Sequence, residues 1–262
     1  GSKIRKYHSL IPFFLSQGMS EVVILGSANS NHVLGITQLL IENRIKPVLY
    51  LRGDPSQKVE GNFSFTKLLV DDNSIRWVSR EDWPHVMEIA SNEQTAFIVP
   101  EGGFHEQALP GALTLAHDIL RNEKERNISF DHIFIDAGTG FMALSLLYEF
   151  ARIEHKAKIN ILLLADDKQQ FLQKVKDFQK YFPDISPENF CLYRPKTARS
   201  FGSTNARIFQ EINLLAKYEG LFTDPIYSGK LFLEAKWILE HQALEGNVLL
   251  IHSGGALALS GF

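Results

Sequence analysis

Short apolar runs alternate with longer amphipathic runs along nearly the whole chain. The short runs are rich in β-branched residues and predict strands. These predicted strands are Glu21–Leu25, Pro47–Leu51, Ser74–Val78, Ala96–Val99, His132–Asp136, Ile159–Leu164, Phe190–Tyr193 and Asn247–Ile251. Apolar positions at helical spacing occupy most of the intervals and predict helices. These predicted helices are Lys3–Leu15, His32–Asn43, Gln107–Arg121, Gly140–Ile153, Lys168–Tyr181, Ala206–Tyr218 and Gly229–Gln242.

The predicted strands are continuously apolar rather than alternating, which favours sheets covered by helices on both faces. Alternation of strands and helices predicts an α/β fold with mostly parallel, twisted sheets. The loop-rich passage Pro100–Pro110 predicts a hinge between two lobes. We therefore expect a smaller α/β domain over residues 1–103 and a larger one over residues 104–262. Ligands of such folds bind at the carboxyl ends of strands, so the turns after the strands are the expected place for chemistry.

The composition narrows the class of function without identifying it. A net charge of −3 leaves no broad basic face for nucleic acid. The single cysteine, Cys191, excludes an intramolecular disulfide framework and suits a reducing compartment. No apolar run reaches membrane-spanning length and no signal peptide is visible, so we expect a cytoplasmic protein. The histidines, including His252, lack metal-ligand spacing, so they are read as structural or solvated and no metal is expected.

Two of the turns that follow strands have the features of anion-binding loops. In Gly26–His32, Ser30 or Asn31 would cap the next helix, whose free backbone N–H groups would face an anion. In Asp136–Gly140, glycines would let the backbone approach a phosphate at a helix start. Each turn also fits a plain capping or turning role. Because the second turn lacks both the third glycine of the dinucleotide fingerprint and the lysine of the P-loop, a nucleotide-binding protein is a distant alternative.

Reactive side chains stand at three further places. Lys3 begins a predicted helix, and a lysine partly desolvated there can lose its proton and attack a carbonyl. The alternative is a solvated basic residue. Tyr227 stands at a helix start after an Asp-Pro turn, or it is an interfacial aromatic bonded to the backbone. Ser253 lies in a glycine-containing turn directly after the last predicted strand.

Taken together, these motifs resemble the D-cysteine desulfhydrase / 1-aminocyclopropane-1-carboxylate deaminase family, along the whole length of the chain. The motifs are Gly1-Ser2-Lys3-Ile4-Arg5-Lys6, Ser30-Asn31-His32, Pro100-Glu101-Gly102-Gly103, Asp224-Pro225-Ile226-Tyr227-Ser228-Gly229-Lys230 and His252-Ser253-Gly254-Gly255. The resemblance implies the tryptophan-synthase-β-like fold, fold type II of the pyridoxal-phosphate enzymes. It also implies a homodimer. The family's strand and loops before the lysine have no counterpart, so the chain is expected to represent part of the family fold.

The resemblance also implies pyridoxal 5′-phosphate as cofactor and a role for each motif. Lys3 would hold the cofactor as a Schiff base and later move the Cα proton. The remaining cofactor contacts would come from Asn31, at the phenolic oxygen, from Gly138, Thr139 and Gly140, at the phosphate, and from Ser228 and Ser253. A small amino-acid substrate would be bound by Ser30, Asn31, His32 and Tyr227, with its carboxylate at the helix N-terminus.

Three departures from the deaminase pattern decide between the family's activities. Ser228 stands where the deaminase has a glutamate, Phe201 where it has a second active-site tyrosine, and Ser253 where it has leucine. A neutral hydroxyl does not keep the ring nitrogen protonated, which suits prompt loss of a good leaving group better than ring opening. We therefore expect a lyase, in a pathway of amino acid metabolism, that converts D-cysteine to pyruvate, hydrogen sulfide and ammonia. A hydrolase is a second enzyme class that we expect.

Other activities stay open. One is 1-aminocyclopropane-1-carboxylate deaminase activity, and D-serine or a chloro-alanine analogue is a possible elimination substrate. A further alternative is a non-catalytic, ligand-binding descendant of the fold. It is suggested by the phosphate loop, which reads Gly138-Thr139-Gly140-Phe141-Met142 instead of the family's Gly-Ser-Gly-Gly-Thr. The presence of Lys3, Ser30 and Tyr227 argues against that alternative.

Overall fold

The computed structural model describes residues 1–94 and 96–262 and divides the chain into two compact units. The N-terminal unit comprises Lys3–Gly111 and Leu257–Phe262, and the central unit comprises Gly1–Ser2 and Ala112–Ala256. The predicted boundary between residues 103 and 104 therefore differs from the boundary in the structure. The physical reason is that the Gly111 amide donates a hydrogen bond to Ser9 Oγ, 3.2 Å away, which keeps residues 104–111 with the first unit.

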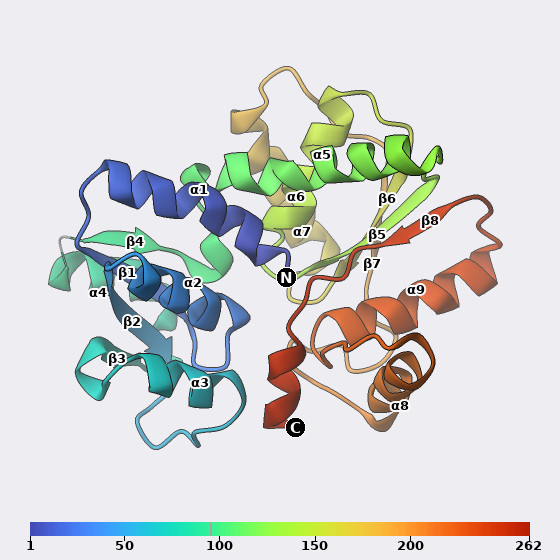
Figure 1. The fold of residues 1–262 in the computed structure, drawn as a ribbon. Helices are drawn as coiled ribbons and strands as arrows, with labels where there is room; N and C mark the ends of the chain where they lie inside the picture. Colours follow the sequence, from blue (N-terminus) through green and yellow to red (C-terminus); the bar gives the residue numbers. More distant parts are fainter. Residues whose placement is uncertain (95) are drawn as a thin grey trace. The chain divides into compact units, whose positions relative to one another are not determined.

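The N-terminal unit contains a four-stranded parallel sheet in the order β3-β2-β1-β4 (Figure 1). Its strands are β1 (Glu21–Ser27), β2 (Lys46–Arg52), β3 (Ile75–Val78) and β4 (Phe97–Val99). Its helices are α1 (Lys3–Ser16), α2 (Asn31–Glu42), α3 (Gly61–Leu69) and α4 (Val86–Glu93). Strand order reverses after β3, so α4 covers the opposite face of the sheet from α2 and α3.

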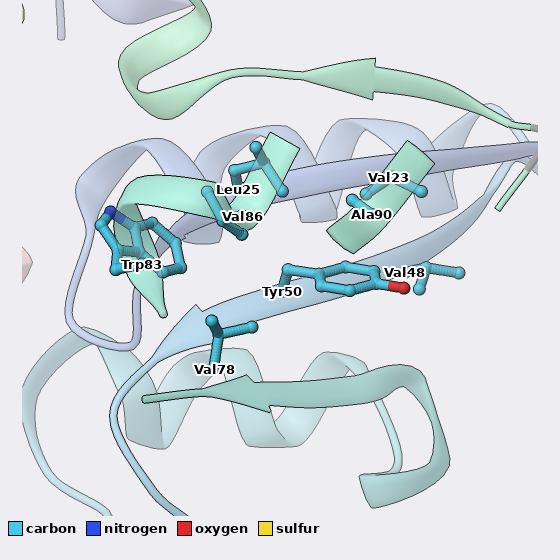
Figure 2. Packing of buried hydrophobic residues seen from close by; sticks show 8 residues of the cluster. All are labelled: Val23, Leu25, Val48, Tyr50, Val78, Trp83, Val86 and Ala90. Carbon is cyan, nitrogen blue, oxygen red and sulfur yellow. The ribbon is translucent and has the colours of Figure 1, made fainter. Parts of the chain in front are cut away.

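The core under α4 shows why the sheet is apolar on this face. Val23 and Leu25 of β1 and Val48 and Tyr50 of β2 point toward Val86 and Ala90 of α4 (Figure 2). Val78 and Trp83 complete this buried cluster. Burial of such side chains stabilises a fold by about 1.5–3 kcal/mol each, so the cluster fixes the strands whose ends carry the site.

The central unit contains a second four-stranded parallel sheet, in the order β7-β6-β5-β8 (Figure 1). Its strands are β5 (His132–Ala137), β6 (Lys158–Leu163), β7 (Phe190–Tyr193) and β8 (Val248–Leu250). Its helices are α6 (Phe141–Arg152), α7 (Lys168–Phe178), α8 (Ala206–Leu214) and α9 (Ser228–Gln242), and α5 (Leu109–Arg126) enters it from the first unit. Buried side chains of α9, among them Leu231 and Ile238, pack on Phe134 of β5.

The prediction of a two-lobed α/β fold with parallel sheets is confirmed, and every predicted strand is present within two residues of its predicted bounds. The predicted helices are also present, although residues 215–219 form a π-helical turn after α8. The prediction missed α3 and α4, which are only 9 and 8 residues long. Both are too short for a clear helical period, since a hydrophobic period needs a window of about 11 residues or more.

Candidate functional site

The predicted loops follow two neighbouring strands of each sheet, one central strand and one edge strand. In the N-terminal unit, the loop after β1 leads to Ser30-Asn31-His32 and the loop after β4 is Pro100–Gly103. In the central unit, the glycine turn 138–140 follows β5 and His252–Gly255 follows β8. Strands β1 and β4 are neighbours, as are β5 and β8, and strand order reverses at both pairs. Such switch points are where open α/β sheets bind ligands.

Two lysines of α1 lie close together. Lys3 is half-buried at the first position of the helix, and Lys6, one turn later, is buried. The Lys6 amine donates a hydrogen bond to the carbonyl oxygen of Gly102. Burial, together with the nearby charge of Lys3, holds the pKa of the Lys6 amine well below its usual range. The start of α1 is therefore a place where an added positive charge is disfavoured.

His32 extends this polar cluster into the unit's interior. Its imidazole is buried, and Nδ1 lies 3.0 Å from the hydroxyl of Tyr7. Burial first, and then the charges of Lys6 and Lys3, hold the pKa of His32 well below its usual range, so the ring is neutral. Gly103 has φ of +67°, and a Cβ there would lie 3.3 Å from His32 Cε1. Both the backbone angle and this close approach favour glycine at that position.

Ser30 caps α2 as the sequence predicts. Its Oγ accepts hydrogen bonds from the backbone amides of His32, at 3.1 Å, and Val33, at 3.4 Å. The His32 amide, predicted to receive a substrate carboxylate, is thus already bonded to Ser30. The hydroxyl proton of Ser30 stays available for another acceptor, because both of these bonds use the oxygen as acceptor. Asn31 is half-buried, and its Oδ1 accepts a 2.7 Å hydrogen bond from Nδ2 of Asn62 in α3.

The glycine turn after β5 is shaped by close contacts. A Cβ on Gly138 would lie 3.0 Å from the ring atom Cε1 of Tyr227. Gly140 has φ of +90°, and a Cβ there would lie 3.1 Å from the ring of Phe171. Thr139 is held from outside the turn, since its carbonyl oxygen accepts a 3.2 Å hydrogen bond from Lys174. The turn opens directly into α6, and the free amides at the start of a helix favour an anion.

Asp224 organises the segment that carries Tyr227 and Ser228. Its carboxylate is fully buried and accepts hydrogen bonds from the amides of Ile226, Tyr227 and Ser228. It also accepts the hydroxyl proton of Ser228 at 2.7 Å, while that hydroxyl accepts from the Asp224 amide at 2.9 Å. Ser228 therefore offers a lone pair to a ligand and not a proton. The ring of Phe201 packs edge-on against Tyr227, with centroids 5.9 Å apart.

The turn after β8 is held by backbone contacts. The Ser253 carbonyl oxygen accepts a 3.0 Å hydrogen bond from the amide of Ser2, the residue before Lys3. The interpretation of His252 as structural is confirmed, since Nδ1 accepts from the Gly254 amide and Nε2 lies 2.8 Å from the Phe222 carbonyl oxygen. Within residues 1–94 and 96–262, no group of three or more acidic, histidine or cysteine side chains could hold a metal ion.

The predicted residues fall into two sets. Those in the N-terminal unit are Lys3, Ser30, Asn31 and His32, and those in the central unit are Gly138, Thr139, Gly140, Tyr227, Ser228 and Ser253. The structure brings Gly138 against Tyr227, two residues far apart in the sequence. Sequence reasoning missed Asn62 and Asp224 as partners of Asn31 and Ser228. The Asp-Pro dipeptide was a signal for Asp224, because aspartate commonly accepts bonds from its own turn.

No family model matches the chain, but individual proteins do. A putative 1-aminocyclopropane-1-carboxylate deaminase of Pyrococcus abyssi is 24% identical, over 97% of this chain and 80% of the relative. A 1-aminocyclopropane-1-carboxylate deaminase of Allorhizobium ampelinum is 24% identical, over 100% of this chain and 84% of the relative.

Among solved structures, a 1-aminocyclopropane-1-carboxylate deaminase homologue superposes with a TM-score of 0.83 at 21% identity, covering 100% of this chain and 81% of its own. This likeness confirms the predicted fold. None of the helices in the described part of the chain combines the length and the apolar character that a membrane-spanning helix requires.

Proposed function

We propose that this chain, which is similar over nearly its whole length to 1-aminocyclopropane-1-carboxylate deaminases, is a pyridoxal-phosphate-dependent member of the deaminase and D-cysteine desulfhydrase family and eliminates sulfide from D-cysteine. Pyridoxal 5′-phosphate is the cofactor, and the enzyme is a lyase of the deaminase type. The hydrolase label is wrong for an elimination, because the leaving group departs from Cβ without attack by water.

The residues of the chain fit this cofactor. The turn Gly138–Gly140 is a cradle that a single Cβ on Gly138 would close against Tyr227, and it lies at the N-terminus of α6, which favours a phosphate. We assign the phenolic oxygen to Asn31, the ring nitrogen to Ser228 or Ser253, and covalent attachment to Lys3. When bound, pyridoxal phosphate supplies an electron sink for the electron pair of the breaking Cα–H bond.

The protein's own groups account for the remaining steps. Lys3 takes the proton from Cα of the substrate, as a lysine amine can when it carries no proton of its own. Ser30 donates its hydroxyl proton to the substrate carboxylate at the N-terminus of α2. Tyr227 lies beside the phosphate turn and orients the substrate. The Cβ–S bond breaks with its electron pair on sulfur, and one water is consumed as pyruvate, hydrogen sulfide and ammonia are released.

One observation carries the preference for D-cysteine. The ring of Phe201 packs against Tyr227, at the position where the deaminases carry a second active-site tyrosine, and it brings no hydroxyl. Ser228 adds to this, because a neutral serine stands where the deaminases carry a glutamate. Opening a cyclopropane ring needs more help from the protein than loss of sulfide does.

A second candidate function is deamination of 1-aminocyclopropane-1-carboxylate. It is favoured by the names of the Pyrococcus and Allorhizobium relatives, which match the chain over 97% and 100% of its length. At 24% identity those names do not separate the two activities in this chain.

A substrate comparison tests the proposal. Protein loaded with pyridoxal phosphate is given D-cysteine, L-cysteine, D-serine or the cyclopropane amino acid, and sulfide, pyruvate, 2-oxobutyrate and ammonia are measured. We expect sulfide and pyruvate in equal amounts from D-cysteine. Lys3→Ala should lower this rate on the order of a hundredfold or more, because a positioned general base is lost. The control is Lys46→Ala, a lysine that pairs with Glu21 on the surface and should leave the rate unchanged.

Two outcomes contradict the proposal. Release of 2-oxobutyrate from the cyclopropane amino acid, without sulfide from D-cysteine, would establish the second candidate function. Loaded protein that releases no product from any of these substrates would favour the non-catalytic descendant.

A further inference from the structure

Asn62 is a fully buried amide at the second position of α3, outside every predicted motif. Its Nδ2 donates two hydrogen bonds into the loop after β1, one to the backbone carbonyl oxygen of Asn29 at 3.1 Å and one to Oδ1 of Asn31 at 2.7 Å. Its own Oδ1 is buried with no hydrogen-bond partner in the part of the chain that the structure describes. The Asn62 side chain therefore acts through its NH₂ group, as a hydrogen-bond donor, and not through its oxygen.

The backbone of Asn29 fixes which way these amides point. A carbonyl oxygen can only accept, so the atom of Asn62 that faces it must be the NH₂ group. That same NH₂ group faces Asn31, so the atom of Asn31 next to it must be the oxygen. The orientation of both side chains thus follows from one group that cannot be flipped.

The consequence is a defined polarity for Asn31. With Oδ1 committed to Asn62, the Asn31 amide turns its Nδ2 donor outward. An amide that is free to rotate could present either its donor or its acceptor to a ligand. The fixed amide of Asn31 can form a good hydrogen bond only with a ligand atom that accepts. The phenolic oxygen of pyridoxal phosphate is such an acceptor, and as an anion it gains most from a fixed donor.

We propose that Asn62 is a positioning residue that locks Asn31 as a hydrogen-bond donor, and so makes the loop after β1 selective for a ligand with an acceptor at ring position 3. This inference rests on the proposed function, since it takes pyridoxal phosphate as the ligand. Asn62 touches neither cofactor nor substrate and acts through Asn31.

A purely structural role for Asn62 predicts a different result. The loop and α3 are also tied by Asn29, whose Oδ1 accepts a 3.0 Å hydrogen bond from the Phe63 amide. If Asn62 only added to this tie, its loss would weaken folding and the binding of every ligand equally. If it sets polarity, its loss would weaken selectively the ligands that carry the oxygen at position 3.

The test uses two non-covalent probes, 4′-deoxypyridoxine 5′-phosphate and its analogue without the 3-hydroxyl group. Neither probe has an aldehyde, so neither reacts with Lys3, and binding is followed by calorimetry. The preference is the ratio of their dissociation constants. For the natural sequence we expect the hydroxylated probe to bind about tenfold tighter, as a hydrogen bond to a charged group allows. Asn62→Ala should reduce this preference to about threefold or less, because the Asn31 amide is then free to rotate.

Polarity reversal gives the sharpest variant. Asn62→Asp replaces the donor by oxygens, which draw Nδ2 of Asn31 inward and turn its Oδ1 toward the probe, so the preference should vanish or invert. Asn31→Asp should do the same while it keeps the bond from Asn62, so it serves where an Asn62 variant does not fold. In an Asn31→Ala background, Asn62→Ala should not change the preference further, because coupled residues are not additive.

The matched control is Asn29→Ala, which removes the bond to the Phe63 amide but keeps the backbone carbonyl that orients Asn62. It should lower the melting temperature and leave the preference unchanged.

Three results would overturn the inference, and they are distinguishable. If the natural sequence shows the preference and both Asn62 variants, folded, retain it, Asn62 does not set the polarity, and the proposed function stands. If Asn31→Asp retains the preference, the donor does not face the ligand. If the natural sequence binds neither probe, the proposed function fails, and this inference fails with it.

Discussion

The loop after β1 and the turn after β5 occupy the same topological place in their own units, yet they are held by opposite means. Ser30, Asn29 and Asn31 hold the first loop through side-chain hydrogen bonds to α2 and α3. The second turn has no such network in its glycines and is held by close packing of Gly138 on Tyr227 and of Gly140 on Phe171. A directed contact to one ligand atom needs oriented side chains, whereas a phosphate, with several equivalent oxygens, needs backbone amides and space.

The largest effect on stability is expected at Asp224, which holds the segment that carries Tyr227. Asp224→Asn exchanges a carboxylate oxygen for an NH₂ group that cannot accept from the Ser228 amide or hydroxyl. We expect the free energy of unfolding to fall by about 3 kcal/mol, because buried hydrogen bonds to a charged acceptor are lost. Chemical denaturation measures this. Asp54→Asn is the matched control, because Asp54 accepts from the amide and hydroxyl of Ser56 in the same way but on the surface. An equally small change in both variants would contradict the role of burial.

The next largest effect is expected on the affinity for pyridoxal phosphate when a methyl group is added to the turn after β5. Gly138→Ala places a methyl group 3.0 Å from the Tyr227 ring, so the ring must shift and the space for a phosphate shrinks. We expect the dissociation constant of pyridoxal phosphate to rise about tenfold, equivalent to about 1.4 kcal/mol. Tyr227→Ala added to Gly138→Ala should restore part of the affinity if crowding is the cause. Gly220→Ala is a control for the loss of a glycine without crowding, since nothing lies within 4 Å of a Cβ there. Unchanged affinity in Gly138→Ala would show that the turn is not a phosphate cradle.

The third effect is a pH dependence of stability that comes from His32, which follows the hydrogen-bonded loop after β1. The pKa of His32 in the fold lies below its unfolded value of about 6.5, so the unfolded chain binds more protons as the pH falls. The stability that neutral His32 contributes is therefore complete above about pH 6.5 and is lost below it, by up to about 1.4 kcal/mol per pH unit. Denaturation measured from about pH 7.5 to about pH 5.5 should show a weaker pH dependence of the unfolding free energy for His32→Gln than for the natural sequence. The exposed His8 provides the control substitution, and an unaltered slope in His32→Gln would contradict the account.

The smallest effect is expected at the cap of α2. Ser30→Ala removes the acceptor of the His32 and Val33 amides and should lower the free energy of unfolding by about 1 kcal/mol. Ser30→Asp should keep the cap and the stability, but its negative charge should repel a substrate carboxylate and raise KM. The two variants thus separate capping from substrate binding, and a KM unaffected by Ser30→Asp would remove Ser30 from the substrate site.

The sequence was most informative where the physics is local. Continuous apolar strands predicted β1, β2, β5 and β6, because burial on both faces leaves a mark on every residue of a strand. The cap at Ser30 was predictable for the same reason, since it acts on amides two and three residues away. The glycine turn was visible as a turn.

What sequence reasoning missed depends on contacts between distant segments. Asn62 reaches Asn31 across 31 positions, and its partner could not be chosen before the packing of α3 beside the loop was known. The same holds for Gly138 and Tyr227, whose contact exists only once α9 covers its face of the sheet. The burial of Lys6 could not be predicted, because Lys6 stands in a run of basic residues typical of a surface and lies two residues from the exposed Ile4 and His8.

The central claim, that this fold carries pyridoxal phosphate on Lys3, is tested most directly by absorption spectroscopy followed by peptide mapping. The absorption spectrum of protein incubated with the cofactor is recorded before and after reduction with borohydride. The reduced protein is then digested and its peptides are examined by mass spectrometry. The account predicts a visible absorption band that borohydride removes and a reduced cofactor found on the peptide that contains Lys3. A protein that takes up no cofactor, or that carries it on another lysine such as Lys6, would contradict it.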